Sequence, residues 1–174
     1  MSNPVPEKLI NFRVYLEGVF DMLGLSDVEL PSFESMTDTV SGAGVAGEVD
    51  APILGHFGAM SLTLNWRTVT QNAMLLAQQR AHPLDLRGSI QQYDASAGQY
   101  KTVPLQVLCS AHPKNIGLGS LQVGSSQENS TELEITRISV LVDNVPNIVL
   151  DKFNYICVIN GVDYLAQVRE NLGL

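Results

Sequence analysis

Apolar and polar residues alternate along much of this chain, which is the period of β-strands that bury one face. The clearest run lies between residues 60 and 67, and its apolar members are Met60, Leu62, Leu64 and Trp66. The same alternation recurs at residues 84–90 and 103–111, with a turn at Gly98 between them. Two neighbouring alternating runs joined by a glycine turn predict an antiparallel pair.

Another strand pair is predicted near the N-terminus. Phe12, Val14 and Leu16 share one face of an opening strand. The dipeptide Glu17-Gly18 then predicts a turn into a second strand over residues 19–23. The chain therefore opens with a predicted hairpin.

The last third of the chain begins with a Gly/Ser/Asn-rich loop over residues 117–129. A strand is predicted over residues 132–142, and Asp143-Asn144 turns it into another strand at 148–150. One more strand is expected at residues 155–159. These are the last strands that the pattern predicts.

Two short helices complete the pattern. Thr70 is placed to cap a helix over residues 71–80, which must end before Pro83. In a C-terminal helix, Asn160 is the expected N-cap and Asp163 lies in the first turn. The apolar stripe of this helix consists of Val162, Leu165, Val168 and Leu172. A helix that docks on the core is the favoured interpretation, and an exposed helix that binds a partner is the alternative.

About eight strands and two helices indicate a mainly β protein of the α+β type. An antiparallel β-sandwich or partly closed barrel with helices at its margins fits this inventory best. The length of 174 residues is that of one ordinary domain. No repeat or low-complexity linker divides the chain, so residues 1–174 are predicted to form a single domain.

Charge is scarce and mostly of one sign. Only 16% of the residues are charged, against about 25% in a typical globular protein, and 18 acids against 10 bases leave a net charge of −8. This balance argues against a protein that grips DNA or an anionic membrane electrostatically. The uncharged polar surface suits contacts between copies, although a biased source composition explains it equally well. No targeting or membrane-spanning pattern is present, so no stable membrane association is expected.

The apparent motifs do not indicate catalysis. Residues 42–47 read GAGVAG, which matches G-x-G-x-x-G, but no apolar strand precedes them and Pro52 and Gly55 obstruct a following helix. A flexible loop is therefore favoured over a nucleotide site. The histidines, His56, His82 and His112, have no metal-ligand spacing and are interpreted as surface or loop residues. The cysteines, Cys109 and Cys157, are interpreted as buried free thiols.

One stretch is specific enough to indicate a family. Residues 159–174, INGVDYLAQVRENLGL, closely resemble the ending of the major tail tube proteins of contractile-tailed phages and of the related R-type bacteriocins. The resemblance continues in the FRVYLEG sequence at residues 12–18, in the glycine loop at residues 42–47 and in Gly88-Ser89. It spans essentially the whole chain and is strongest over the last twenty or so residues.

The resemblance implies a structural protein and not an enzyme. Six copies would form a ring through a shared, continuous lumenal β-barrel, and the rings would stack into a hollow tube inside a contractile sheath. The implied partners are further copies of the chain, the sheath protein, a baseplate or tube initiator, and the tape-measure and tail terminator proteins. DNA would be a transient, non-specific cargo during genome ejection, and no cofactor is implied. The implied location is the virion tail or a phage-tail-like particle, assembled in the bacterial cytoplasm.

The residues themselves leave other functions open. One alternative is the tube protein of a bacterial secretion system, and another is a soluble β-barrel that binds a ligand. In a tube, Gly42, Gly44, Gly47 and Glu48 would form a ring-to-ring contact loop, because such a loop is too flexible for a core and too apolar for open solvent. The C-terminal motif and its docking helix comprise Asn160, Gly161, Val162, Asp163, Leu165 and Val168.

Overall fold

A computed structural model describes residues 4–17 and 20–174 of the chain. The strands within these residues are β1 (Pro4–Leu16), β2 (Phe20–Asp21), β3 (Leu25–Glu29), β4 (Ser35–Ser41), β5 (Glu48–Phe57), β6 (Ser61–Trp66), β7 (His82–Asp94), β8 (Gln99–Gly117), β9 (Asn129–Val142), β10 (Val145–Asp151), β11 (Ile156–Ile159) and β12 (Val162–Asp163). The helices are α1 (Gln71–Leu75) and α2 (Ala166–Leu172). The protein is mostly β and its sheets are antiparallel, as the alternation predicts.

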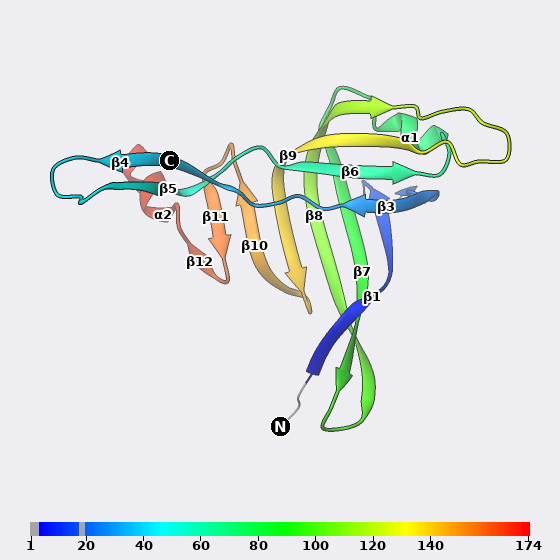
Figure 1. Ribbon diagram of the computed structural model, residues 1–174, viewed down its shortest axis with the longest axis horizontal. Coiled ribbons are helices and arrows are strands. Elements are labelled where there is room, and N and C mark those ends of the chain that lie inside the picture. Colours follow the sequence, from blue (N-terminus) through cyan, green and yellow to red (C-terminus); the bar gives the residue numbers. More distant parts are fainter. Residues whose placement is uncertain (1–3, 18–19) are drawn as a thin grey trace.

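Ten strands form one sheet that branches at β9. Along its main path the order is β12-β11-β10-β9-β8-β7-β1-β2, whereas β6 pairs with the first half of β9 and with β3. The second half of β9 pairs with β10, and β8 follows β9 along most of its length. The branch lies across one end of the long strands, as Figure 1 shows, so a curved body encloses a core. We call this ten-stranded sheet, together with α1, the body.

The core lies where the β6 branch faces the long strands. All four apolar residues of the run at 60–66 are buried, with Leu62 and Leu64 at 0% exposure. They pack with residues of the neighbouring strands, namely Val14, Leu16, Leu84, Leu86, Val107, Cys109, Ala111, Leu133, Ile135 and Ile138. The predicted alternating faces are thus confirmed in β1, β6, β7 and β8.

Helix α1 closes one end of this core but is shorter than predicted. The Thr70 side chain accepts a hydrogen bond from the Ala73 N–H at 3.1 Å, which confirms it as the N-cap. The helix ends at Leu75, and the chain continues in turns up to Arg80. The Gln78 carbonyl oxygen lies 2.9 Å from Nε2 of the buried His82 ring. In a longer helix this carbonyl would instead accept a hydrogen bond from a backbone N–H. The helix therefore ends well before Pro83, and a local side-chain contact holds the turn that follows it.

The long hairpin of β7 and β8 extends beyond the core. Its strands are in register from His82 and Ala111 down to Asp94 and Gln99, and they turn at Gly98 as predicted. Asp94 is 3% exposed at this tip and accepts hydrogen bonds from Ser96 and Lys101. Alongside, β1 pairs with β2 only at its last two residues, so in the described chain its outer edge has no strand partner over residues 4–14.

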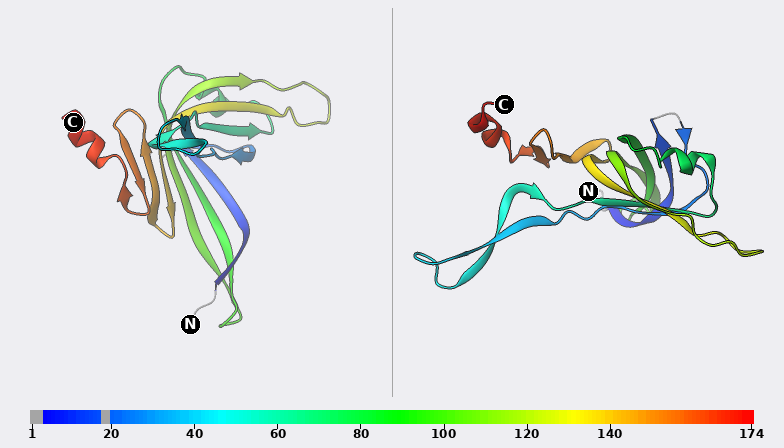
Figure 2. Two further views of the ribbon diagram at one scale, coloured as in Figure 1. Left: turned by 60° about the vertical axis from the view of Figure 1, so that its left-hand side comes forward. Right: turned by 90° about the horizontal axis from the view of Figure 1, so that it is seen from above.

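A second sheet consists only of β4 and β5. The two strands form a long hairpin that leaves the body and projects away from it (Figures 1 and 2). Alternation predicts none of β3, β4 and β5. The residues of β3 and β4 are mostly polar and lack a repeating apolar face, and Pro52 and Gly55 interrupt the pattern of β5. The predicted turn at Glu17-Gly18 and the strand at 19–23 lie partly outside the described residues, and only β2 is described there.

The C-terminal segment differs from the prediction. Asn160 and Gly161 have φ of 49° and 83° and form the tight turn between β11 and β12, so Asn160 does not cap a helix. Helix α2 begins six residues later, at Ala166, after Leu165. A polar Asn-Gly pair between two extended segments favours a hairpin turn, and this local preference prevails over the helical spacing of the apolar residues.

Helix α2 does not dock on the core as predicted. None of its residues is buried, although Val168 packs partly against the core. Leu172 is exposed, whereas Leu165, just before the helix, is buried. Of the predicted apolar stripe, Leu165 is thus buried before the helix begins, while the helix itself stays largely exposed. No helix within the described residues has the length and apolarity needed to cross a membrane.

Candidate functional site

The β4–β5 hairpin is an apolar surface without a core of its own. All seven residues of β4 are exposed, and so are most of those of β5. Its exposed apolar residues are Met36, Val40, Val45, Val49, Ile53 and Leu54. An isolated two-stranded hairpin is at best marginally stable in water, and exposed apolar residues on a projecting element are typical of a contact with another molecule. This hairpin is therefore the first candidate for a functional surface.

The predicted contact loop lies at the tip of this hairpin. Gly42, Gly44 and Gly47 have φ between 96° and 130°, and a Cβ built on any of them meets no atom within 4 Å. The Val45 N–H donates to the Gly42 carbonyl at 3.0 Å, and Glu48 begins β5 directly after the loop. All four residues predicted for the loop are thus together at the most remote point of the hairpin.

The hairpin is also acidic. Residues 31–60 contain Glu34, Asp38, Glu48 and Asp50 and no Lys or Arg. Asp50 accepts a hydrogen bond from the Thr39 hydroxyl across the strand pair at 2.8 Å. None of the four carboxylates has an ion pair within the described residues.

Most Lys and Arg residues of the chain form ion pairs with acidic residues of the same chain. Eight of them pair with acids of the same chain: Arg13 with Asp21, Arg80 with Glu17, Arg87 with Asp85, Lys101 with Asp94, Lys114 with Glu132, Arg137 with Asp151, Lys152 with Glu134, and Arg169 with Asp163. Among the described residues only Lys8 and Arg67 lack such a pair. Because four of the five bases of residues 61–126 are paired in this way, little positive charge remains there to face a neighbouring copy.

The hairpin bends where it leaves the body. Ser35 pairs with Phe57 and Thr37 pairs with Pro52, so a bulge in β5 lies between these two pairs. We call residues 53–56 in this bulge the elbow, and residues 37–52 beyond it the arm. In the elbow, Gly55 has φ of 67°, and Nδ1 of His56 lies 2.8 Å from the Leu54 carbonyl oxygen. Bulges bend strands. This bulge separates the arm from the short base of the hairpin, which is the Ser35–Phe57 pair next to the body.

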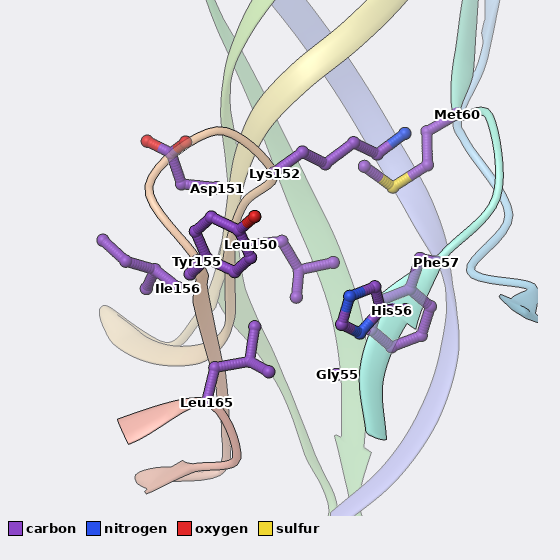
Figure 3. A pocket seen from close by; sticks show the side chains of 10 residues that line it. All are labelled: Gly55, His56, Phe57, Met60, Leu150, Asp151, Lys152, Tyr155, Ile156 and Leu165. Atoms are coloured by element: carbon purple, nitrogen blue, oxygen red, sulfur yellow. The ribbon is translucent and has the colours of Figure 1, made fainter. Parts of the chain in front are cut away.

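The elbow packs against the C-terminal segment. A Cβ built on Gly55 would lie 2.6 Å from Cγ of Leu165, which is closer than side chains tolerate. A cavity of about 240 Å³ borders this contact (Figure 3). Its lining includes His56, Lys152 and Tyr155, from the elbow and from the segment between β10 and β11.

The charged residues of the C-terminal motif have a structural role in this geometry. The Asp163 carboxylate accepts the Leu165 N–H at 3.0 Å and pairs with the Arg169 guanidinium at 2.5 Å. The hydrogen bond from Arg169 lowers the pKa of Asp163, and the same bond raises the pKa of Arg169. Arg169 also donates to the Tyr155 carbonyl at 2.6 Å. The motif thus ties α2 to the two hairpins before it.

The two groups of predicted site residues lie at different parts of the same feature. The glycine loop forms the tip of the hairpin, whereas Leu165 packs against its elbow. Asp163 belongs to β12 with Val162 and holds the Leu165 N–H, and Asn160 and Gly161 form the turn before β12. Sequence reasoning missed Gly55 and Arg169. A glycine within an otherwise extended stretch is the usual signal of a bulge and could have identified Gly55.

The remaining candidate residues show no catalytic arrangement. His82 is fully buried at the start of β7, so its interpretation as a surface or loop residue is wrong. His112 is exposed in β8, which confirms it as a surface residue, and His56 is half-buried in β5. Both cysteines are free and buried, as predicted. Burial raises the pKa of Cys109 to about 12 and also raises that of Cys157. Within the described residues no three His, Cys, Asp or Glu side chains are grouped as a metal site requires.

The sequence matches one known family over nearly its whole length. The family model of phage tail tube protein FII matches residues 6–173. The chain is 27% identical to the tail tube protein of Escherichia phage P2 over 176 residues, which covers 98% of this chain and 99% of that protein.

Solved structures show the same fold. A chain from the sheath/tube terminator of the extracellular contractile injection system PVC has a TM-score of 0.53 at 16% identity, covering 78% of this chain and 96% of that one. A chain from the extended PVC sheath-tube complex has a TM-score of 0.52 at 15% identity, covering 78% and 91%. The family match over nearly the whole length shows that the chain belongs to the phage tail tube protein FII family.

Proposed function

We propose that six copies of this tail tube protein close into a ring and that the rings stack into a hollow tube, each stacking contact being made by the β4–β5 hairpin. The observation that carries the proposal is the hairpin itself, which exposes six apolar side chains and has no core of its own. A neighbouring ring would cover this apolar surface and stabilise a strand pair that is marginal alone.

The open edges of the main sheet support the closed ring. In the part of the chain that the structure describes, the outer edge of β1 has no strand partner over residues 4–14 at one end of the sheet, and β12 pairs only with β11 at the other end. Such edges are prone to pair with other chains, and closure into a barrel removes them. In the ring, the sheets of neighbouring copies would continue one another as a lumenal barrel, with residues 1–174 acting as one assembly unit.

The proposed tube has the partners of a contractile particle. They are the sheath protein, a baseplate or tube initiator, and the tape-measure and terminator proteins. The similarity to chains from a sheath-tube complex and a sheath/tube terminator supports the first and the last of these. The protein would act without catalysis in the tail of a phage or of a phage-tail-like particle such as a bacteriocin, after assembly in the bacterial cytoplasm.

The charge distribution supports a smooth passage for DNA. Because eight of the ten bases pair within the chain, the net charge of −8 reflects carboxylates without a basic partner. A wall of this sign repels a phosphate backbone and does not retain it. DNA would therefore be a transient, non-specific cargo of the tube.

The hairpin tip provides the test. Gly44→Leu and Gly47→Leu should block tube growth while the subunit still folds, because a Cβ built on either glycine meets no atom of its own chain within 4 Å. Tube length is measured by electron microscopy and folding by circular dichroism. Gly124→Leu is the control, since Gly124 also has a positive φ of 82° and no atom near its Cβ position, but lies in the loop between β8 and β9. Unchanged tube lengths in the Gly44 and Gly47 variants would contradict the proposal.

A further inference from the structure

We propose that Leu165 is a positioning residue, which sets the direction of the arm by filling the elbow of the β4–β5 hairpin. The inference rests on the proposed function, because it gives the C-terminal motif the task of aiming the arm at the neighbouring ring. It assigns the motif a role in ring stacking although the motif lies far from the glycine tip.

The base of the hairpin is firmly attached to the body. Phe57 packs edge-on against Phe33 with ring centroids 6.3 Å apart, and the Gly58 N–H donates to the Glu34 carbonyl at 2.9 Å. The Lys152 ammonium donates to the Gly58 carbonyl at 2.8 Å. The first point at which the hairpin is free to change direction is therefore the elbow.

The elbow is irregular and has one close neighbour from a distant part of the chain. The strand pairing is interrupted between Ser35 and Thr37, so ladder hydrogen bonds do not hold the bend. Leu165 is 4% exposed and occupies the space in which a side chain at position 55 would lie. The angle between the base and the arm thus depends on the Leu165 side chain. Only a residue without a Cβ fits at position 55 while Leu165 stays in place.

Leu165 is itself held at a defined position. Its N–H is fixed by the Asp163 carboxylate, and that carboxylate is fixed by Arg169, which also holds the Tyr155 carbonyl. A chain of direct contacts therefore links α2, the β11–β12 hairpin and the elbow. Helix α2 has no buried residue, but its Arg169 guanidinium holds the Asp163 carboxylate. Through this carboxylate, α2 orients the segment that carries Leu165.

The space around the contact allows the arm to move without unfolding the body. The cavity of about 240 Å³ borders Gly55, Leu165 and Leu150. A displaced Leu165 or a shifted elbow can enter this space. Leu165 belongs to the same buried cluster as Trp66, so Leu165→Ala is also expected to lower the stability of the subunit. The rest of the cluster is unchanged in the elbow variants, and the subunit should therefore stay folded while the arm is redirected.

The test measures the direction of the arm in the unassembled subunit. Spin labels on Val45→Cys at the hairpin tip and on Val145→Cys in the body report one distance by pulsed electron paramagnetic resonance. The native cysteines are buried and so are poor labelling sites. Gly55→Ala and Leu165→Ala should each abolish the wild-type distance peak, and the double variant should restore part of it, because the added methyl group fills part of the vacated space.

Gly98→Ala is the matched control. Gly98 has φ of 64°, close to the 67° of Gly55, but the nearest atom to its Cβ position is 3.9 Å away. Its backbone strain is therefore similar, and the distance peak should stay unchanged. A wild-type peak in both Gly55→Ala and Leu165→Ala would overturn the inference, whatever the tubes do.

Tube assembly of the same variants separates this inference from the proposed function. A lost distance peak together with lost tubes supports both. A lost distance peak with normal tubes shows that Leu165 positions the arm but overturns the hairpin as the stacking contact. Circular dichroism of each variant confirms that the subunit is folded when the distance is measured.

Discussion

The body and the β4–β5 hairpin are both antiparallel β-structure, yet they differ in what stabilises them. In β6 every second residue is buried, down to 0–1% exposure, whereas no residue of β4 is even partly buried. The body therefore carries its own hydrophobic core, whereas the described contacts of the arm are those between its own two strands. The comparison teaches that one chain can contain a part with a core of its own and a part that, in the proposed tube, only a neighbouring copy would cover.

The same contrast separates stability from assembly. Burial of apolar surface contributes about 25 cal/mol per Å², so substitutions in the core should change the free energy of unfolding of the subunit. The apolar residues of the arm are exposed before and after unfolding of a free subunit. Their substitution should leave the free energy of unfolding nearly unchanged and should reduce tube assembly.

The largest effect on unfolding is expected for Trp66→Ala. Trp66 is 1% exposed at the centre of the core, and truncation of a buried aromatic residue costs about 3–5 kcal/mol. Urea unfolding followed by circular dichroism measures the loss. A loss well under about 1 kcal/mol would contradict the view that this core holds the body together.

A smaller effect is expected for Thr131→Val. The Trp66 indole N–H donates to the Thr131 hydroxyl at 3.1 Å, and valine leaves this buried donor without a partner. The expected loss is about 1–3 kcal/mol in the same urea experiment. Thr63→Val is the control, because Thr63 lies on the other, less buried face of β6. Equal losses in the two variants would mean that the hydrogen bond is unimportant.

The smallest effect on unfolding is expected in the arm. Val40 and Val49 are strand partners and are 46% and 55% exposed, so threonine at both positions retains the β-branched shape and removes apolar surface. The unfolding free energy should change by about 0.5 kcal/mol or less, while tube assembly, measured by electron microscopy, should fall. Val123→Thr, in the exposed loop before β9, should change neither. A large loss of subunit stability would show that the arm belongs to the body after all.

Periodicity identified the elements that bury a regular face. The strands around Trp66 and the β7–β8 hairpin follow from alternation, because a buried strand face requires an apolar residue at every second position. The strands β3 and β4 could not be found in this way, since neither has a regular apolar face. The C-terminal helix was placed too early because Val162 and Leu165 have helical spacing, while Asn160-Gly161 forms a turn.

By itself, the sequence determined the β class, the core faces, the buried thiols and, through its C-terminal motif, the family resemblance. Only the tertiary structure decided that the glycine loop is the tip of a projecting hairpin and that Leu165 meets Gly55. The physical reason is the range of the interactions. Strand alternation and turn preferences act between neighbours in the chain, whereas the elbow contact joins residues more than one hundred positions apart, which only the assembled sheet brings together.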